Sequence, residues 1–148
     1  MAVMEEALCT YLLSKTAVTS LIGTGSAARL TADHLPQAYN VSQGSAAVYE
    51  IMDGDDVHTL SDRAGFVETI VQFASYAETY KAAMALARAI KNCGITAQKG
   101  VYAGVDFRSV EINQGVRCYG NETPTDGSDS WRYLAEFEFK ICYLEGDA

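Results

Sequence analysis

The sequence predicts an α+β fold, a mostly antiparallel β-sheet with helices packed on one face. Two segments, 3–14 and 77–92, carry apolar residues at helical spacing. The segment from Trp131 to Leu144 alternates apolar and polar residues, which is typical of a strand with one buried face. Because predicted strands follow one another between and after the helices, the order of elements indicates an α+β sandwich.

Two helices are expected in the first part of the chain. The first has one apolar stripe, formed by Met4, Leu8, Tyr11 and Leu12. A shorter helix is expected from Ala17 to Ile22, where Thr16 can act as the N-cap and Gly23 can end the helix. A short strand is expected near Arg29–Thr31.

The middle of the chain predicts two strands and the longest helix. The strands are Ala46–Met52 and Phe66–Ser75, and residues 53–65 between them have the Asp and Gly content of a polar connection. The helix at 77–92 is expected to bury Tyr80, Ala83, Met84, Ala87 and Ile90. Gly94 is expected to follow its end.

The C-terminal part predicts further strands, at Val105–Ile112, Val116–Tyr119 and Trp131–Leu144, with a polar loop at 120–130. In the last strand the apolar face carries Trp131, Tyr133, Ala135, Phe137, Phe139, Ile141 and Tyr143. At about 3.3 Å per residue this strand would extend roughly 46 Å, whereas a domain of this size is about 40 Å across. The strand should therefore break at a bulge or project as an edge that needs a partner.

Length and charge limit the classes of function. The 148 residues, with 49% hydrophobic and 20% charged, fit one domain spanning 1–148. The net charge of −8 argues against a nucleic-acid reader and against an anionic membrane surface as partner. The first residues lack the basic start of a secretory signal, and no apolar stretch is long enough to span a bilayer. The protein is therefore expected in the host cytoplasm while it is made.

No residue pattern predicts a catalytic, cofactor or metal site. The four cysteines form no CxxC pair, so reduced thiols are expected. His58 lies near Asp55 and Asp56, but their spacing does not match a calcium loop, and Asp and Gly are common in turns. Residues 23–26 lack the lysine of a phosphate-binding loop, and no serine lies in a GxSxG motif. We therefore do not expect an enzyme.

The segment from His58 to Ile90 resembles the tail-completion, or tail terminator, proteins of long-tailed phages. The resemblance lies in a His-x-Leu loop that ends at Gly65, a strand containing Gln72, an Ala-Glu-Thr-Tyr helix start at 77–80 and an Ala-Leu-rich helix. Residues 17–23 and the aromatic last strand resemble the start and end of that family.

The resemblance implies a structural virion protein that forms a ring, a hexamer in relatives, on the finished tail tube. Such a ring forms the head–tail joint at the neck, with the tail tube protein and the head connector or stopper protein as partners. DNA passes through its lumen without specific binding. Similar proteins occur in gene transfer agents and prophage-derived particles. The resemblance carries no catalytic residue.

Two segments are expected to take part in assembly, the 53–65 connection and the last strand. The connection is long for a hairpin, so we expect it to be mobile in the free subunit and to order against a neighbour. Candidate interface residues are Asp55, Asp56, His58, Leu60, Asp62, Arg63, Trp131 and Tyr133. An acidic lumen would repel DNA, and it could be lined by the acidic connections, 53–65 and 120–130, or by the Glu136/Glu138 face of the last strand.

Two alternatives remain open at this point. One is a head-side connector or stopper protein of the neck, which also forms rings. The other belongs to a different class, a small cytosolic α+β enzyme or ligand-binding domain. A pocket holding His58 with a carboxylate, in a protein that stays monomeric, would favour the second alternative.

Overall fold

A six-stranded sheet forms the frame of the protein. The computed structural model describes residues 4–33, 39, 44–58, 63–97, 99–122 and 132–144. The strands lie in the order β1-β2-β3-β6-β5-β4, and their bounds are β1 Leu30–Ala32, β2 Ala46–His58, β3 Arg63–Ala77, β4 Gly100–Tyr102, β5 Val105–Glu122 and β6 Arg132–Leu144. Only β1 pairs in parallel, with β2, and every other neighbouring pair is antiparallel. The predicted mostly antiparallel sheet is confirmed.

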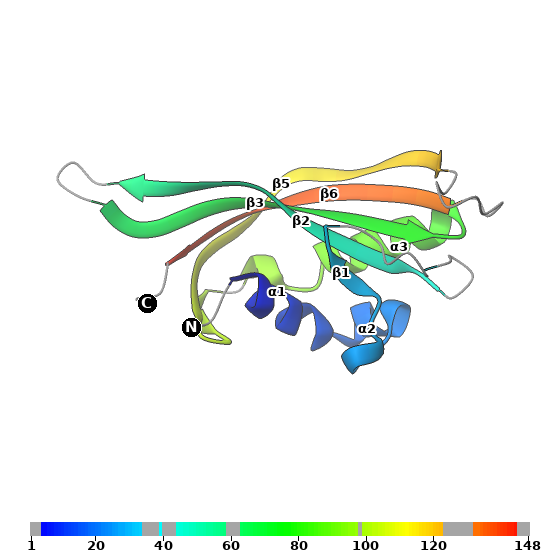
Figure 1. Cartoon of the computed structure of the whole chain (residues 1–148), viewed down its shortest axis with the longest axis horizontal. Helices are drawn as coiled ribbons and strands as arrows, with labels where there is room; N and C mark the ends of the chain where they lie inside the picture. The colour runs from blue at the N-terminus through cyan, green and yellow to red at the C-terminus, as the bar shows by residue number, and fades with distance from the viewer. Residues whose placement is uncertain are drawn as a thin grey trace.

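Three helices cover one face of this sheet (Figure 1). They are α1 (Met4–Leu13), α2 (Thr16–Ile22) and α3 (Tyr80–Lys91), and short 3-10 turns follow at Gly25–Ala27 and Ile95–Ala97. One cluster of buried side chains joins all three helices to the sheet. The predicted placement of the helices on one face is therefore confirmed. Within the described segments, no helix is long and apolar enough to cross a membrane.

In the core, a cross-strand row of small side chains lies beside a row of aromatic ones. Aromatic Tyr49, Phe73 and Phe137 share one row, and small Ala47, Ser75 and Ala135 share the next. The rings of Phe73 and Phe137 stack with centroids 5.6 Å apart. α3 packs over β3, β5 and β6 and buries Ala83 and Ala87, so small side chains on both sides let the helix approach the sheet closely.

The first two helices agree with prediction except at one cap. The predicted stripe of α1 is buried. In α2, Thr16 is the first helical residue rather than the N-cap, so that expectation is wrong. Lys15 occupies the cap position in an extended conformation and its side chain makes no capping hydrogen bond. At the other end, Gly23 adopts φ +92° and its N–H donates to Thr19 O at 2.8 Å, so glycine ends the helix as expected.

The start of α3 lies three residues later than predicted. Thr79 is its N-cap, and its Oγ1 accepts a hydrogen bond from Ala82 N at 3.1 Å. Tyr80 was expected in the buried stripe but is 55% exposed, because it occupies the first position of the helix and lies against Tyr133 at the sheet margin. Leu86 completes the buried face instead.

The predicted connection at 53–65 is wrong in its length. β2 continues to His58 and β3 begins at Arg63, so only residues 59–62 remain between the strands, and they lie outside the described part. The register with β3 shifts at Met52, because Ile51 pairs with Val71 while Asp53 pairs with Ile70. Pairing with β3 thus overrides the turn preference of the Asp and Gly residues. Figure 1 shows the two strands extending beyond the helices.

The strand at 105 is also longer than predicted. β5 runs through to Glu122, where the sequence predicted two strands and then a loop from residue 120. Its register with β6 shifts at several places, among them between Ile112 and Gln114 and between Gln114 and Arg117. These irregularities accommodate residues such as Gly115 without ending the strand.

β6 lies at the centre of the sheet, so the expectation of a projecting edge strand is wrong. Its register with β3 is unbroken from Tyr133 to Leu144, and β5 pairs along its other side. The strand can exceed the usual length because both neighbours are longer still, with 15 residues in β3 and 18 in β5 against 13 in β6. Its predicted apolar face is confirmed, with Ala135, Phe137, Phe139 and Ile141 buried.

Candidate functional site: the polar face and open edges of the sheet

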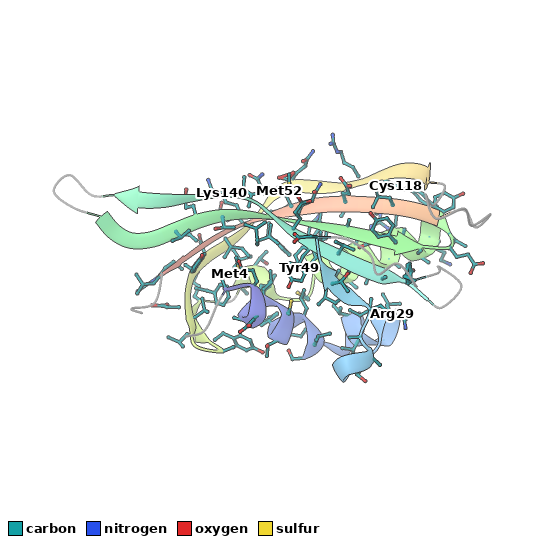
Figure 2. The ribbon with its side chains drawn as sticks, viewed as in Figure 1. Met4, Arg29, Tyr49, Met52, Cys118 and Lys140 are labelled. Carbon is teal, nitrogen blue, oxygen red and sulfur yellow. The ribbon has the colours of Figure 1, made fainter. Side chains whose placement is uncertain are left out.

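The face of the sheet opposite the helices is polar and acidic. We call it the helix-free face. Figure 2 shows Met4 and Tyr49 between the sheet and the helices, with Lys140 on the opposite side. Charged residues on or beside the helix-free face are Glu50, Glu68, Asp106, Glu111, Glu136, Glu138, Arg108, Arg117 and Lys140. Carboxylates therefore outnumber cations on the described part of this face.

A network of side-chain hydrogen bonds ties β3, β5 and β6 together across this face. Gln72 Nε2 donates to Glu136 Oε2 at 2.9 Å, and Asn113 Nδ2 donates to Glu138 Oε1 at 3.0 Å. In the amide orientation that satisfies both ends, Gln114 donates to Glu138 at 2.7 Å and accepts from Arg117 at 3.1 Å. These bonds hold the irregular part of β5 against β6 and fix the positions of both glutamates.

On the described part of this face, the charged surface carries a shallow hollow. A hollow among Gln72, Gln114, Arg117, Glu136 and Glu138 has an empty volume of about 150 Å³, open solvent included. Pockets for drug-sized ligands are usually about 300–1,000 Å³. Within the described residues, no group of three or more His, Cys, Asp or Glu side chains could hold a metal ion.

The far end of the face carries further charges around Cys142. Arg108 and Asp106 form an ion pair at 2.9 Å, and Lys140 lies 4.0 Å from Glu68. Burial raises the pKa of the Cys142 thiol from 9.0, and the Glu68 carboxylate raises it further. Cys142 is therefore a thiol rather than a thiolate at neutral pH.

The predicted interface residues fall in two places. Asp55 and Asp56 lie in β2, with their backbones paired to Glu68 and Val67, and the last residue of β2, His58, pairs with the first of β3, Arg63. Leu60, Asp62 and Trp131 lie outside the described residues. Tyr133 is half-buried near the start of β6, and its ring meets that of Tyr80 edge-to-face at 6.4 Å. Tyr133 pairs with Ala77 at the end of β3, so it lies at the opposite end of the sheet from the His58–Arg63 pair.

Sequence reasoning did not identify the two open edges of the sheet. β1 pairs only with Ala47–Tyr49 of β2, and β4 pairs only with Val105–Phe107 of β5. Beyond these short strands, no described strand covers residues 50–58 of β2, the β2 edge, or residues 108–118 of β5, the β5 edge. An uncovered strand presents unpaired backbone donors and acceptors to a partner.

Large apolar side chains lie at both edges. Ile51 and Met52 of the β2 edge are 39% and 51% exposed, and Ile112 of the β5 edge is 37% exposed. In the sequence these residues resemble ordinary core positions of strands. Only the strand order reveals that they lie at the margins of the sheet.

Comparisons with known proteins show a likeness in structure but none in sequence. No family model matches the sequence, and no curated protein matches it. Among solved structures, the chain is similar to a chain of the "Virion of native gene transfer agent (GTA) particle". The TM-score is 0.59 at 12% sequence identity, and the match covers 95% of this chain and 94% of that one. At this identity the likeness shows that the two chains share a fold.

Proposed function

We propose that this chain is a structural virion protein that caps the completed tail tube as a ring and forms the head–tail joint. The observation that carries the proposal is the match, over nearly the whole of both chains, to the fold of a chain in a gene transfer agent virion. The resemblance of residues 58–90 to tail terminator proteins supports the specific role at the end of the tube.

The distribution of helices and charge supports a ring with an acidic lumen. In a closed ring of sheets, the layer that carries the helices needs more room and lies outside, which leaves the helix-free face toward the axis. That face carries the fixed carboxylates of Glu136 and Glu138. An acidic surface repels DNA phosphates within about 8 Å at physiological salt, whereas a basic lumen would bind them through counterion release. We therefore assign the lumen to the helix-free face.

Electron microscopy of the purified protein with tail tubes of its own particle tests the proposed role. We expect closed rings with a central hole and decoration of one tube end in negative stain. Binding to the head-side ring alone would instead identify a head-side connector or stopper. Protein that stays monomeric at every concentration, even with tubes present, would contradict both structural roles.

Charge reversal tests the lumen. Glu136→Lys combined with Glu138→Lys should give assembled rings that bind duplex DNA at physiological salt, whereas rings of the unmodified protein should not. The matched control is Glu6→Lys combined with Glu78→Lys, which makes the same charge change at an exposed position of α1 and an exposed position just before α3. DNA binding by rings of the control variant, or by unmodified rings, would contradict the assignment of an acidic lumen to the helix-free face.

A further inference from the structure

We infer that neighbouring copies join edge to edge, with the β2 edge of one copy against the β5 edge of the next, so that Ile51 of one copy contacts Ile112 of the other. This inference rests on the proposed ring and identifies the surface that closes it. The partner is a second copy of this chain.

One apolar row crosses the four long strands and ends at both open edges. The register pairs Ile51 with Val71, Val71 with Phe139, and Phe139 with Ile112. The two inner side chains are fully buried. The two outer isoleucines are exposed to nearly the same degree, 39% and 37%. A second copy placed beside the first would continue this row, covering Ile112 of one copy with Ile51 of the next.

Strand direction fits this continuation. β2, β3, β6 and β5 each run antiparallel to the next, so β2 and β5 run in opposite directions. When two copies in the same orientation meet, the β5 edge of one is therefore antiparallel to the β2 edge of the other. Cross-strand apolar pairs of this kind stabilise antiparallel sheets.

The ends and irregularities of the edges restrict where copies can meet. β1 covers one end of β2 and β4 covers the opposite end of β5. On β5, the regular stretch from Ser109 to Ile112 is bounded by register shifts, and on β2 a shift lies at Met52. Bulges limit strand pairing with other chains. The seam is therefore short and centred on the two isoleucines, which favours one defined register over open-ended aggregation.

Two exposed large apolar side chains away from this row, Val101 and Tyr80, do not form such a pair. Val101 is 71% exposed, but it lies on β4 and pairs with Asp106, outside the stretch of β5 from Ser109 to Ile112. Tyr80 contacts Tyr133 at the margin of the helix layer. Val101 therefore provides a matched control, a β-branched residue at least as exposed but outside the seam.

A head-to-tail seam makes a distinctive prediction for mixed variants. Each copy uses two different edges, so Ile51→Asp damages one edge and Ile112→Asp damages the other. Each variant alone should remain monomeric under conditions in which the unmodified protein forms rings, because each seam weakens at least about tenfold. An equimolar mixture should form dimers and nothing larger, since only one intact pair of edges is available.

Light scattering coupled to size exclusion measures these masses, with circular dichroism to confirm that the variants are folded. If the aspartate variants unfold, Ile51→Thr and Ile112→Thr replace them, because they keep β-branching. Alone and in mixture, they should give the same pattern of masses as expected for the aspartate variants. Val101→Asp should still form rings. Rings of normal mass in either isoleucine variant, or a mixture without dimers, would overturn the seam while leaving the proposed function in place. Absence of rings from the unmodified protein, with tubes present, would instead overturn the proposed function.

Discussion

Replacing Arg29 by alanine should loosen the joint between α2 and the sheet. Its Nε donates to Ser45 O at 2.8 Å and its Nη2 donates to Leu21 O at 2.9 Å. Figure 2 shows the residue beside α2, just before β1. Hydrogen bonds from a charged donor contribute about 1.5–3 kcal/mol each, and water can replace part of this at a half-buried site. We expect Arg29→Ala to lower the free energy of unfolding by about 2–3 kcal/mol.

Gly44 allows the coupling of this joint to be measured. It has φ +123°, and a Cβ at this position would lie 2.5 Å from Nη2 of Arg29. Gly44→Ala should therefore strain the backbone and displace the arginine from both carbonyls. In the Arg29→Ala background only the backbone strain, about 1–3 kcal/mol, remains. The double variant should be more stable than the sum of the single effects predicts, by about 2 kcal/mol.

Urea unfolding followed by circular dichroism gives the four free energies of this cycle. Effects that add within about 0.5 kcal/mol would contradict this prediction, because they would mean that Gly44 and Arg29 do not share a contact. The result also bears on assembly. The carbonyl of Arg29 accepts from Ala47 N at 2.9 Å, so this residue helps to place β1, which sets where the β2 edge begins.

Two further predictions concern the core. Ser75 Oγ is buried and has no hydrogen-bond partner among the described residues, so Ser75→Ala should stabilise the protein by about 1 kcal/mol. A scanning-calorimetry Tm that rises by about 2–4 °C would agree, and a lower Tm would mean that the hydroxyl is bonded. Burial and a hydrogen bond with Cys9 raise the pKa of Tyr49 from 10.0 to about 12. The Tyr49 hydroxyl therefore ionises at a higher pH in the folded state than in the unfolded state. The stability that Tyr49 contributes is fully present below pH 10 and should be lost as the pH rises to about 12. Tyr49→Phe should remove this part of the pH dependence of unfolding, and an unchanged profile would contradict it.

The sequence determined the elements whose signal is local. α1, α2 and α3 follow from apolar periodicity within one segment each, because a helix makes its hydrogen bonds among near neighbours. The apolar face of β6 follows in the same way from alternation, and with it the acidic face of Glu136 and Glu138. One face of the candidate site was therefore predictable.

The features that depend on strand pairing became visible only in the folded chain. Asp53 to His58 have a turn-like composition, yet β3 supplies them with backbone partners from a distant part of the chain. The length of β6 suggested a projecting edge strand, yet it pairs on both sides. Ile51 and Ile112 are ordinary strand residues until the strand order places them at opposite margins of one sheet. Strand order is set by hydrogen bonds between segments far apart in sequence, which no local pattern encodes.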